Sequence, residues 1–262
     1  MRYYSIKPDH QLASIVRSFW VFEGEGSLHS PFISQCFATE CPGFVFHYKG
    51  HFTQMDNNTG IEKSVFNAGL YGQSGLINEF ITRESFGIFG VYLYPHTLTR
   101  IFKLPAHHFT HQLFDLESLL GKEGRLLEEQ INLAKNVHQR IEIVTDFIIK
   151  AVDKNEVYIP GIFESIENAI MSAGTINITQ IAEQCSLSRR QFERKFKEYT
   201  GFSPKQFCRM TRFNAALKSF QHTISLTQLA YDLGYYDQSH FTNDFKAFSG
   251  IKPSEYFLKH AL

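Results

Sequence analysis

The chain has 262 residues, enough for one large domain or two ordinary domains, each with a buried core. Aromatic residues make up 15% of it, a content that argues against a disordered chain, and the formal net charge is zero. The halves differ, because residues 160–262 carry 12 Lys and Arg against 9 Asp and Glu, whereas residues 1–159 carry 14 against 17. A basic C-terminal half is compatible with a phosphate-bearing partner, although so small an excess does not identify one.

Residues 2–9 are too polar for the apolar core of a signal peptide, and no apolar run approaches the length that spans a membrane. The four cysteines lie far apart in the chain. Cys185 and Cys208 fall on apolar faces of predicted helices, so we expect buried, reduced thiols. These features predict a soluble, cytoplasmic protein that has no membrane partner.

The N-terminal part is predicted to be rich in short strands. Residues 8–20 place apolar side chains at helical spacing, which predicts a short helix before the strands. Runs rich in Phe, Val, Ile and Tyr then alternate with glycine and polar turns, and the predicted strands are 19–22, 44–48, 70–73, 79–82 and 86–93. This pattern predicts an antiparallel β-rich domain, a sandwich or a cupin-like barrel, rather than βαβ units.

Helices are predicted after the strands. Pro95 begins a helix that ends before Leu104-Pro105, and two amphipathic helices follow at residues 122–134 and 136–152. The last two could pack on the β-rich domain, form the seam of a homodimer, or do both. We therefore predict an α+β chain with a β-rich sensor-like domain at residues 1–120, a connector of candidate dimer helices at 121–158, and an all-α domain at 159–262 that begins near the boundary sequence 157–161.

One predicted helix, at residues 188–199, combines an apolar stripe with a cationic face. Its aromatic side chains recur at i, i+4 and i+7, namely Phe192, Phe196 and Tyr199. Ser188 and Gln191 form a capping box that starts the helix. A shorter amphipathic helix at 178–185 precedes it, and a tight turn separates the two helices. This order is the layout of a helix-turn-helix. On this stretch alone, a helical hairpin with a solvated charged face fits equally well.

A second copy of this pattern follows 49 residues later. The offset pairs Phe192 with Phe241, and it continues to a Gly-x-x-Pro sequence that starts at Gly201 and again at Gly250. A long helix over residues 203–220 is predicted to connect the copies. A repeated apolar stripe, turn and downstream motif indicates duplicated supersecondary structure, which favours two helix-turn-helix units over a solvated hairpin.

These residues resemble the AraC/XylS family of bacterial transcription regulators. The resemblance covers about residues 160–258 and is carried by Ile181-Ala182, the helix through Phe192 and Phe196, Thr200-Gly201-Phe202-Ser203-Pro204, Ala230-Tyr231-Asp232-Leu233-Gly234-Tyr235, Ser239-His240-Phe241 and the sequence from Phe245 to Tyr256. The N-terminal half resembles the uncharacterised sensor-like domain of a subset of this family. The resemblance implies a sequence-specific DNA-binding regulator with double-stranded DNA as partner and a small-molecule effector as a candidate partner.

The resemblance also implies the DNA-binding residues. It places base-facing positions and outward cations on Arg189, Arg190, Glu193, Arg194, Lys197, Gln238, Ser239, His240, Asn243 and Lys246. The residue types suit this role, since Arg can fork onto guanine, Gln or Asn can clamp adenine, and Glu can accept from cytosine. Lys195, Lys197 and Lys246 suit phosphates, which position a protein without specifying sequence. Asn243 and Asp244 stand where members often carry a cation, which predicts a weaker contribution or a different site preference.

Metal chemistry is the competing reading of the N-terminal half. The sequence contains Cys36, Cys41, His47 and His51 near a predicted strand pair, and a second loose group at His107-His108-x-x-His111. Neither spacing matches a standard zinc site. No nucleophile elbow, phosphate loop or paired acidic motif is found, so we expect no enzyme and no cofactor. The alternative to the regulator is a metal-dependent barrel enzyme or metal sensor with a DNA-binding appendage.

Some aromatic residues of the predicted strands could line a binding site for the effector. Most of them should fill the core of the β-rich domain, and the remainder could line an apolar pocket with a few polar groups, the usual form of a small-molecule site. The polar residues that we place nearest such a pocket are His47, Gln73 and Arg83.

Overall fold

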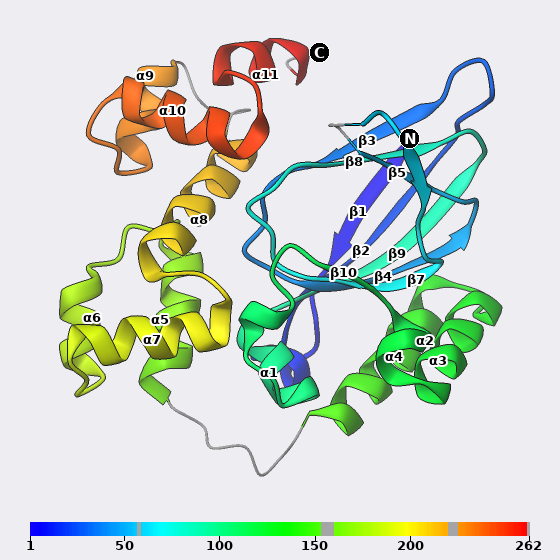
Figure 1. Cartoon of the computed structure of the whole chain (residues 1–262), viewed down its shortest axis with the longest axis horizontal. Helices are drawn as coiled ribbons and strands as arrows, with labels where there is room; N and C mark the ends of the chain where they lie inside the picture. The colour runs from blue at the N-terminus through cyan, green and yellow to red at the C-terminus, as the bar shows by residue number, and fades with distance from the viewer. Residues whose placement is uncertain (57–58, 153–159, 220–224, 261–262) are drawn as a thin grey trace. The chain divides into compact units, whose positions relative to one another are not determined.

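The computed structural model describes residues 1–56, 59–152, 160–219 and 225–260 (Figure 1). Its contacts divide the chain into two compact units. Unit 1 consists of Met1–Cys36, Cys41–Gln73 and Asn78–Glu156, and unit 2 consists of Phe37–Glu40, Ser74–Ile77 and Val157–Leu262. The boundary sequence 157–161 falls mostly outside the described residues, so the three predicted domain limits stay a prediction.

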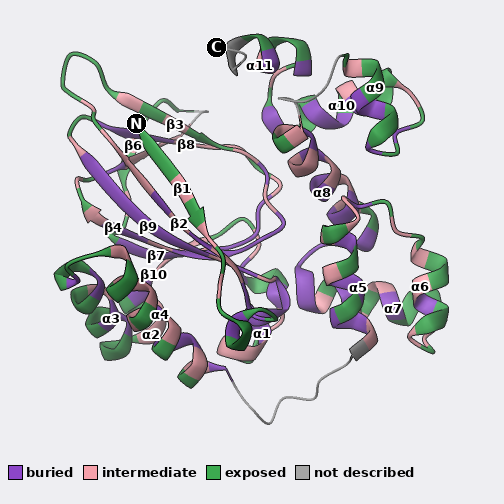
Figure 2. Ribbon diagram, turned by 180° about the vertical axis from the view of Figure 1, so that it is seen from behind, coloured by how far each residue is buried: buried purple, intermediate pink, exposed green. Residues whose placement is uncertain are grey.

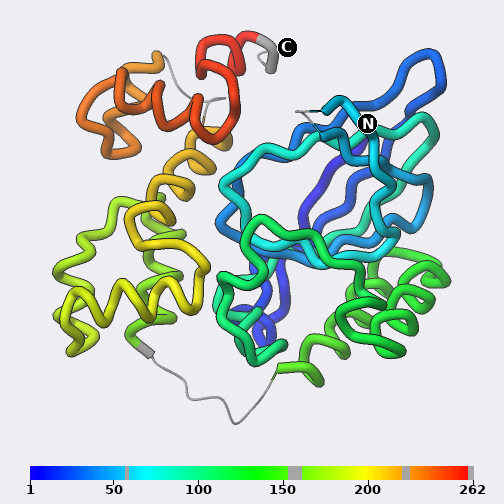
Figure 3. The backbone as a smooth tube through the Cα atoms, viewed as in Figure 1, coloured from blue at the N-terminus to red at the C-terminus, as the bar shows by residue number. Residues whose placement is uncertain are grey.

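Unit 1 is built on two antiparallel sheets, which confirms the predicted α+β class. The first sheet has the order β1 (Arg2–Ile6), β2 (Val16–Gly24), β9 (Phe86–Leu93), β4 (Gly43–Lys49), β7 (Ala68–Tyr71) and β10 (Leu113–Asp115). The second has the order β3 (Phe32–Cys36), β8 (Asn78–Thr82), β5 (Thr53–Met55) and β6 (Glu62–Ser64). The second sheet lies over one face of the first, and helices lie over the other face (Figure 3).

The central strands of the first sheet alternate their side chains between these two layers. Phe19 of β2 packs in the cluster that the helices cover, whereas Trp20 packs against the cluster between the sheets. Gly90 of β9 pairs with Trp20 across the ladder, and a methyl group at position 90 would overlap the indole ring. Glycine is therefore required at position 90 by this close approach. Figure 2 shows β4 and β9 as mostly buried strands.

The helix predicted over residues 8–20 is wrong. The structure has a single 3-10 turn, η1 (His10–Leu12), and β2 already begins at Val16. The register of β2 against β9 shifts between Val16 and Ser18, so Val16 and Phe19 are both buried. A bulge that puts residues i and i+3 of a strand on one side imitates the spacing of a helix.

The remaining helices of unit 1 are α1 (His96–Phe102), η2 (Ala106–His108), α2 (Leu116–Leu120), α3 (Lys122–Leu133) and α4 (Val137–Ala151). Asn136 caps α4, because its side chain accepts a hydrogen bond from the Gln139 amide at 3.0 Å. The apolar sides of α3 and α4 pack on the first sheet, with the Phe44 and Phe147 ring centroids 5.7 Å apart. The expectation that these helices pack on the β-rich domain is thus confirmed, and the dimer seam stays a prediction.

Unit 2 contains α5 (Pro160–Met171), α6 (Ile178–Gln184), α7 (Arg189–Thr200), α8 (Pro204–Ser219), α9 (Leu226–Asp232), α10 (Gln238–Ser249) and α11 (Pro253–His260). The long helix α8 runs from the α6–α7 pair to the α9–α10 pair (Figure 1). Phe220, predicted to end this helix, lies outside the described residues. In the described part of the chain, no helix is both long enough and apolar enough to cross a membrane.

Candidate nucleic-acid interface

The first candidate reader helix is α7, and its ends are fixed by its own sequence. The Ser188 amide donates to Gln191 Oε1 at 2.9 Å, and the Gln191 amide donates to Ser188 Oγ at 3.4 Å, so the predicted capping box is present. Gly201 ends the helix in the left-handed region with φ of 78°. Phe192 and Phe196 between these ends are fully buried, which orients the rest of the helix surface outward.

The outward side of α7 carries the predicted DNA-binding residues of the first copy. Arg190, Arg194 and Lys197 are exposed. Arg189 Nε lies 3.0 Å from Glu193 Oε1, an ion pair along the exposed surface of the helix. Such a pair is weak in water, so both side chains remain free to exchange it for contacts to a duplex. The outward side of α7 therefore carries three exposed cationic side chains together with the Arg189–Glu193 ion pair.

Lys195 is placed differently from the other cations of α7. Its Nζ lies 3.0 Å from Glu198 Oε2, and its side chain is about two-thirds buried, with 31% exposed. Successive residues of an α-helix lie about 100° apart, so Lys195 does not share the side of α7 that carries Arg190 and Arg194. A phosphate contact through Lys195 remains a prediction.

The second candidate reader helix is α10, which repeats this arrangement. Asp237 caps it by accepting a hydrogen bond from the His240 amide at 2.7 Å. Gly250 ends it with φ of 76°, as Gly201 ends α7. The exposed residues of α10 include all five that the sequence assigned to the second copy, namely Gln238, Ser239, His240, Asn243 and Lys246.

Two of these residues are held by their neighbours before any duplex is present. Gln238 Oε1 accepts a hydrogen bond from Thr227 Oγ1 of α9 at 2.7 Å, which joins the two helices of the unit. The His240 ring stands perpendicular to the Tyr235 ring with the centroids 5.2 Å apart. Tyr235 is buried in the turn before α10. The second reader therefore presents polar side chains whose positions are partly fixed by the turn and by α9.

The structure assigns Asp244 a role that sequence reasoning missed. Asp244 is 3% exposed, and its carboxylate accepts a hydrogen bond from Arg209 Nη2 of α8 at 2.7 Å. The sequence spacing does predict that Asp244 is buried, because it follows Phe241 at i+3 and so falls on the buried stripe of α10. Asp244 therefore does not replace a DNA-facing cation, contrary to its sequence interpretation.

Two of the residues assigned to an effector, His47 and Gln73, are buried in unit 1. His47 packs against the Phe52 ring at 5.1 Å between the centroids, and burial lowers the pKa of its imidazole to about 4. Its Nδ1 has no hydrogen-bond partner in the described part of the chain. Gln73 donates to the Ala106 carbonyl at 2.9 Å and to Thr110 Oγ1 at 3.1 Å. Gln73 is thus engaged through its amide nitrogen by the loop after α1, and both Gln73 Oε1 and His47 Nδ1 are buried without a partner among the described residues.

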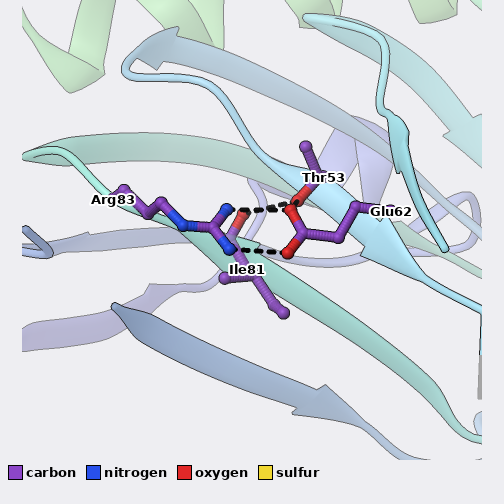
Figure 4. A network of polar contacts seen from close by, with 4 residues as sticks. All are labelled: Thr53, Glu62, Ile81 and Arg83. Carbon is purple, nitrogen blue, oxygen red and sulfur yellow. Dashed lines mark hydrogen bonds and ion pairs between the residues drawn. The ribbon is translucent and has the colours of Figure 1, made fainter. Parts of the chain in front are cut away.

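Arg83, the third residue assigned to an effector, is exposed and engaged at the second sheet (Figure 4). Its guanidinium donates to both carboxylate oxygens of Glu62, at 2.8 and 2.6 Å, and Thr53 Oγ1 donates to the same carboxylate at 2.7 Å. The hydrogen bonds from Arg83, and then that from Thr53, lower the pKa of Glu62 to about 2. These contacts tie β5, β6 and the end of β8 together, and Arg83 shares none of them with His47 or Gln73.

The groups considered for a metal are not brought together. Cys41 is buried and accepts a hydrogen bond from Arg17 Nη1 at 3.0 Å, whereas His51 Nδ1 lies 3.2 Å from Asn67 Oδ1. Among the described residues, no group of three or more His, Cys, Asp or Glu side chains could hold a metal ion. Within the described part of the chain, the candidate donors of the N-terminal half therefore do not form such a group.

Two family profiles match the chain. One, described as a helix-turn-helix domain, matches residues 181–259, and the other, described as a domain of unknown function (DUF6597), matches residues 4–115. An uncharacterized HTH-type transcriptional regulator of Haemophilus influenzae is 35% identical over 83 residues, 30% of this chain and 27% of that protein. The HTH-type transcriptional activator RhaS of Escherichia coli strain SE11 is 35% identical over 75 residues, 28% of this chain. The chain thus spans about 27% of the length of each of these relatives.

Solved structures are similar at lower identity. ToxT from Vibrio cholerae O395 is 15% identical with a TM-score of 0.49, and the match covers 92% of this chain and 97% of that one. An AraC-type regulator from Chromobacterium violaceum is 28% identical with a TM-score of 0.36, and the match covers 39% and 93%. Residues 181–259 therefore form a helix-turn-helix domain of the AraC type, and residues 4–115 belong to a domain family of unknown function.

Proposed function

We propose that the chain is a sequence-specific DNA-binding transcription regulator in which α7 and α10 read two segments of one duplex. The observation that carries this proposal is the duplication of the exposed polar surface together with the buried one. Each helix buries its aromatic stripe, and each presents polar or cationic residues at its N-terminal half, where reader helices contact base edges. Two such helices on one helical scaffold suit successive segments of the major groove.

The exposed side chains suit different parts of the duplex. Arg190 and Arg194 can each fork onto the O6 and N7 atoms of guanine, and Asn243 can clamp adenine. Lys197 and Lys246 occupy the same place in the two copies, 49 residues apart, and both lie in the last turns of their helices. A position that keeps its charge in both copies suits the phosphate backbone, which is the same at every segment. The proposal includes no catalytic step.

Unit 1 supports a sensing role in this proposal. His47 Nδ1 is a buried polar atom that has no partner among the described residues, and its ring packs on Phe52 of the apolar cluster between the sheets. A small molecule with a hydrogen-bonding group and an apolar body suits these surroundings. Such an effector alters DNA binding only if it binds one functional state of the chain more tightly than another.

A homodimer through α3 suits the same proposal. Leu126 and Leu133 are exposed by 42% and 82%, and they lie seven residues apart on one side of this helix. Apolar residues at heptad spacing on an exposed helix are typical of a seam between two helices. A second copy of the chain is the partner that such a stripe suits, since a two-fold axis brings the same stripe of both copies together.

The proposal is tested by selection from a random duplex library with the full-length protein. The expected result is a consensus with two recognised segments and an affinity that falls steeply as salt rises, because neutralised phosphates release counterions. A selection that yields no consensus, or binding that is insensitive to salt, would overturn the DNA-reading function.

A further inference from the structure

A partly buried ion pair joins α10 to the helix that connects the two readers. Arg209 of α8 donates from Nε to both carboxylate oxygens of Asp244, at 3.1 Å each, and from Nη2 to Oδ1 at 2.7 Å. The Asp244 side chain is 4% exposed, and that of Arg209 is 34% exposed. The carboxylate is therefore held by a planar donor whose geometry allows little rotation.

Arginines of α8 also contact aromatic rings of α10 and of the turn before it. Arg209 also lies over the Phe248 ring, with its guanidinium carbon 5.5 Å from the centroid. Arg212, nearly one turn further along α8, lies over the Tyr235 ring at 4.8 Å. The pKa of Tyr235 is raised, first by burial and then by the charge of Asp244. Two arginines of α8 thus contact the buried side of α10 and the turn that precedes it.

The first copy lacks this arrangement at the equivalent position. The offset of 49 residues places Lys195 of α7 where Asp244 stands in α10, and Lys195 pairs with Glu198 of its own helix at 3.0 Å. The contact between α7 and α8 includes the Phe196 and Phe207 rings, whose centroids are 5.3 Å apart. Aromatic pairs accept both offset-stacked and edge-to-face arrangements, so they permit small rotations that a forked ion pair does not.

We propose that the Arg209–Asp244 pair fixes the rotation of α10 on α8, and thereby sets the spacing between the two DNA segments that the protein accepts. The inference rests on the proposed DNA-reading function and deepens it. Arg209 and Asp244 are positioning residues, since the buried carboxylate is unavailable to a duplex. A duplex turns once in about 10.5 base pairs, so a change of one base pair rotates the second segment by roughly a tenth of a turn. If α10 is fixed on α8, the protein should lose affinity for a duplex with the changed spacing. If α10 can rotate on α8, it can adjust to the changed spacing and keep its affinity.

A purely stabilising role of the pair makes a different prediction. Replacing a buried ion pair by apolar side chains of similar volume is often neutral or stabilising, whereas removing one partner alone leaves a buried charge unpaired. The decisive variant is therefore the double substitution Arg209→Met with Asp244→Leu. It removes the directional contact and keeps the packing between α8 and α10.

The experiment measures the affinity of the full-length protein for a set of duplexes. Each duplex carries the two segments selected by the wild type, with the spacing between them shortened or lengthened by one base pair. We expect the wild type to lose affinity by roughly tenfold or more at the wrong spacing, comparable to the cost of one mismatched base pair. The double variant should bind all spacings within about threefold of one another, a difference well below the tenfold that corresponds to 1.4 kcal/mol.

The control is Gln228→Ala with Asp232→Ala, which removes the hydrogen bond from Gln228 Nε2 to Asp232 Oδ1 within α9, at 2.7 Å. Because that hydrogen bond lies within one helix, this variant should keep the spacing preference of the wild type. If Arg209→Met with Asp244→Leu does not unfold cooperatively, Arg209→Lys decides instead, since it keeps the charge but loses the fork. A wild-type spacing preference in these variants overturns the inference, whereas a wild type that selects no duplex overturns the DNA-reading function itself.

Discussion

Phe192 of α7 and Phe241 of α10 occupy the same place in the two copies of the helix-turn-helix, and both are fully buried. Each precedes a second buried phenylalanine by four residues, and the ring centroids within each pair are 5.6 and 5.7 Å apart. The aromatic stripe therefore determines which side of each helix faces outward. Changes to the stripe should act on folding, and changes to the opposite side should act on DNA.

Replacing Arg194 by Ala should weaken binding to the selected duplex by about 1–3 kcal/mol, because a forked contact to guanine would be lost. Lys197→Ala is the matched control on the same helix, and it should weaken binding to selected and scrambled duplexes by similar factors. Fluorescence anisotropy with a labelled duplex measures both. Equal losses for Arg194→Ala on the two duplexes would reassign this arginine to a phosphate.

Replacing Phe241 by Ala should lower the free energy of unfolding of unit 2 by roughly 3–5 kcal/mol, because a large buried ring is removed and a cavity remains. Tyr236→Ala, at a side chain that is 88% exposed, should change it by less than about 0.5 kcal/mol. Urea unfolding followed by far-ultraviolet circular dichroism measures both variants. An unchanged transition for Phe241→Ala would contradict the role of the stripe in folding.

Acid should destabilise unit 1 through His47 and His96. Burial lowers the pKa of each imidazole from 6.5 to about 4. Between these values the unfolded chain binds a proton that the folded protein does not, so the free energy of unfolding should fall as the pH falls from about 6.5 to about 4. His47→Leu should reduce this dependence, which urea unfolding at several pH values measures. His29→Asn, at an exposed residue, should leave it unchanged.

Replacing Leu133 by Glu should convert a homodimer into a monomer, because two carboxylates would meet where two apolar stripes pack. Sedimentation equilibrium of the full-length protein measures the mass. Leu28→Glu is the control, since Leu28 is 79% exposed at another place in unit 1 and should leave the mass unchanged. A wild type that is monomeric at all concentrations would contradict the role proposed for α3.

The helical half was predictable from sequence because its signals are local and repeated. The capping box at Ser188, the glycine after each reader helix and the 49-residue offset all involve residues close in the chain, and the structure contains each of them. The pairing of Asp244 with Arg209 crosses 35 residues, so no local pattern reveals its partner. The i+3 spacing of Asp244 from Phe241 indicates a buried carboxylate that needs a partner, but it does not indicate which residue that partner is.

The β-rich half was less predictable because its strands are completed by distant partners. β1 and β3 were not predicted, since their residues are mostly exposed and their hydrogen bonds go to β2 and β8. Arg83 illustrates the same limit at the candidate effector site. Its charge suggested a ligand contact, but folding brings Glu62 of β6, two strands from β8 in the same sheet, within 2.6 Å.

The position of Trp20 over Gly90 has a practical consequence, because Trp20 is the single tryptophan of the sequence. Its emission spectrum reports on the space between the two sheets, and unit 2 contributes none of it. Intrinsic tryptophan fluorescence therefore observes the unfolding of unit 1 in the intact protein without any attached dye. A compound that enters the aromatic cluster should shift or quench this emission, and a duplex bound only at α7 and α10 should leave it unchanged.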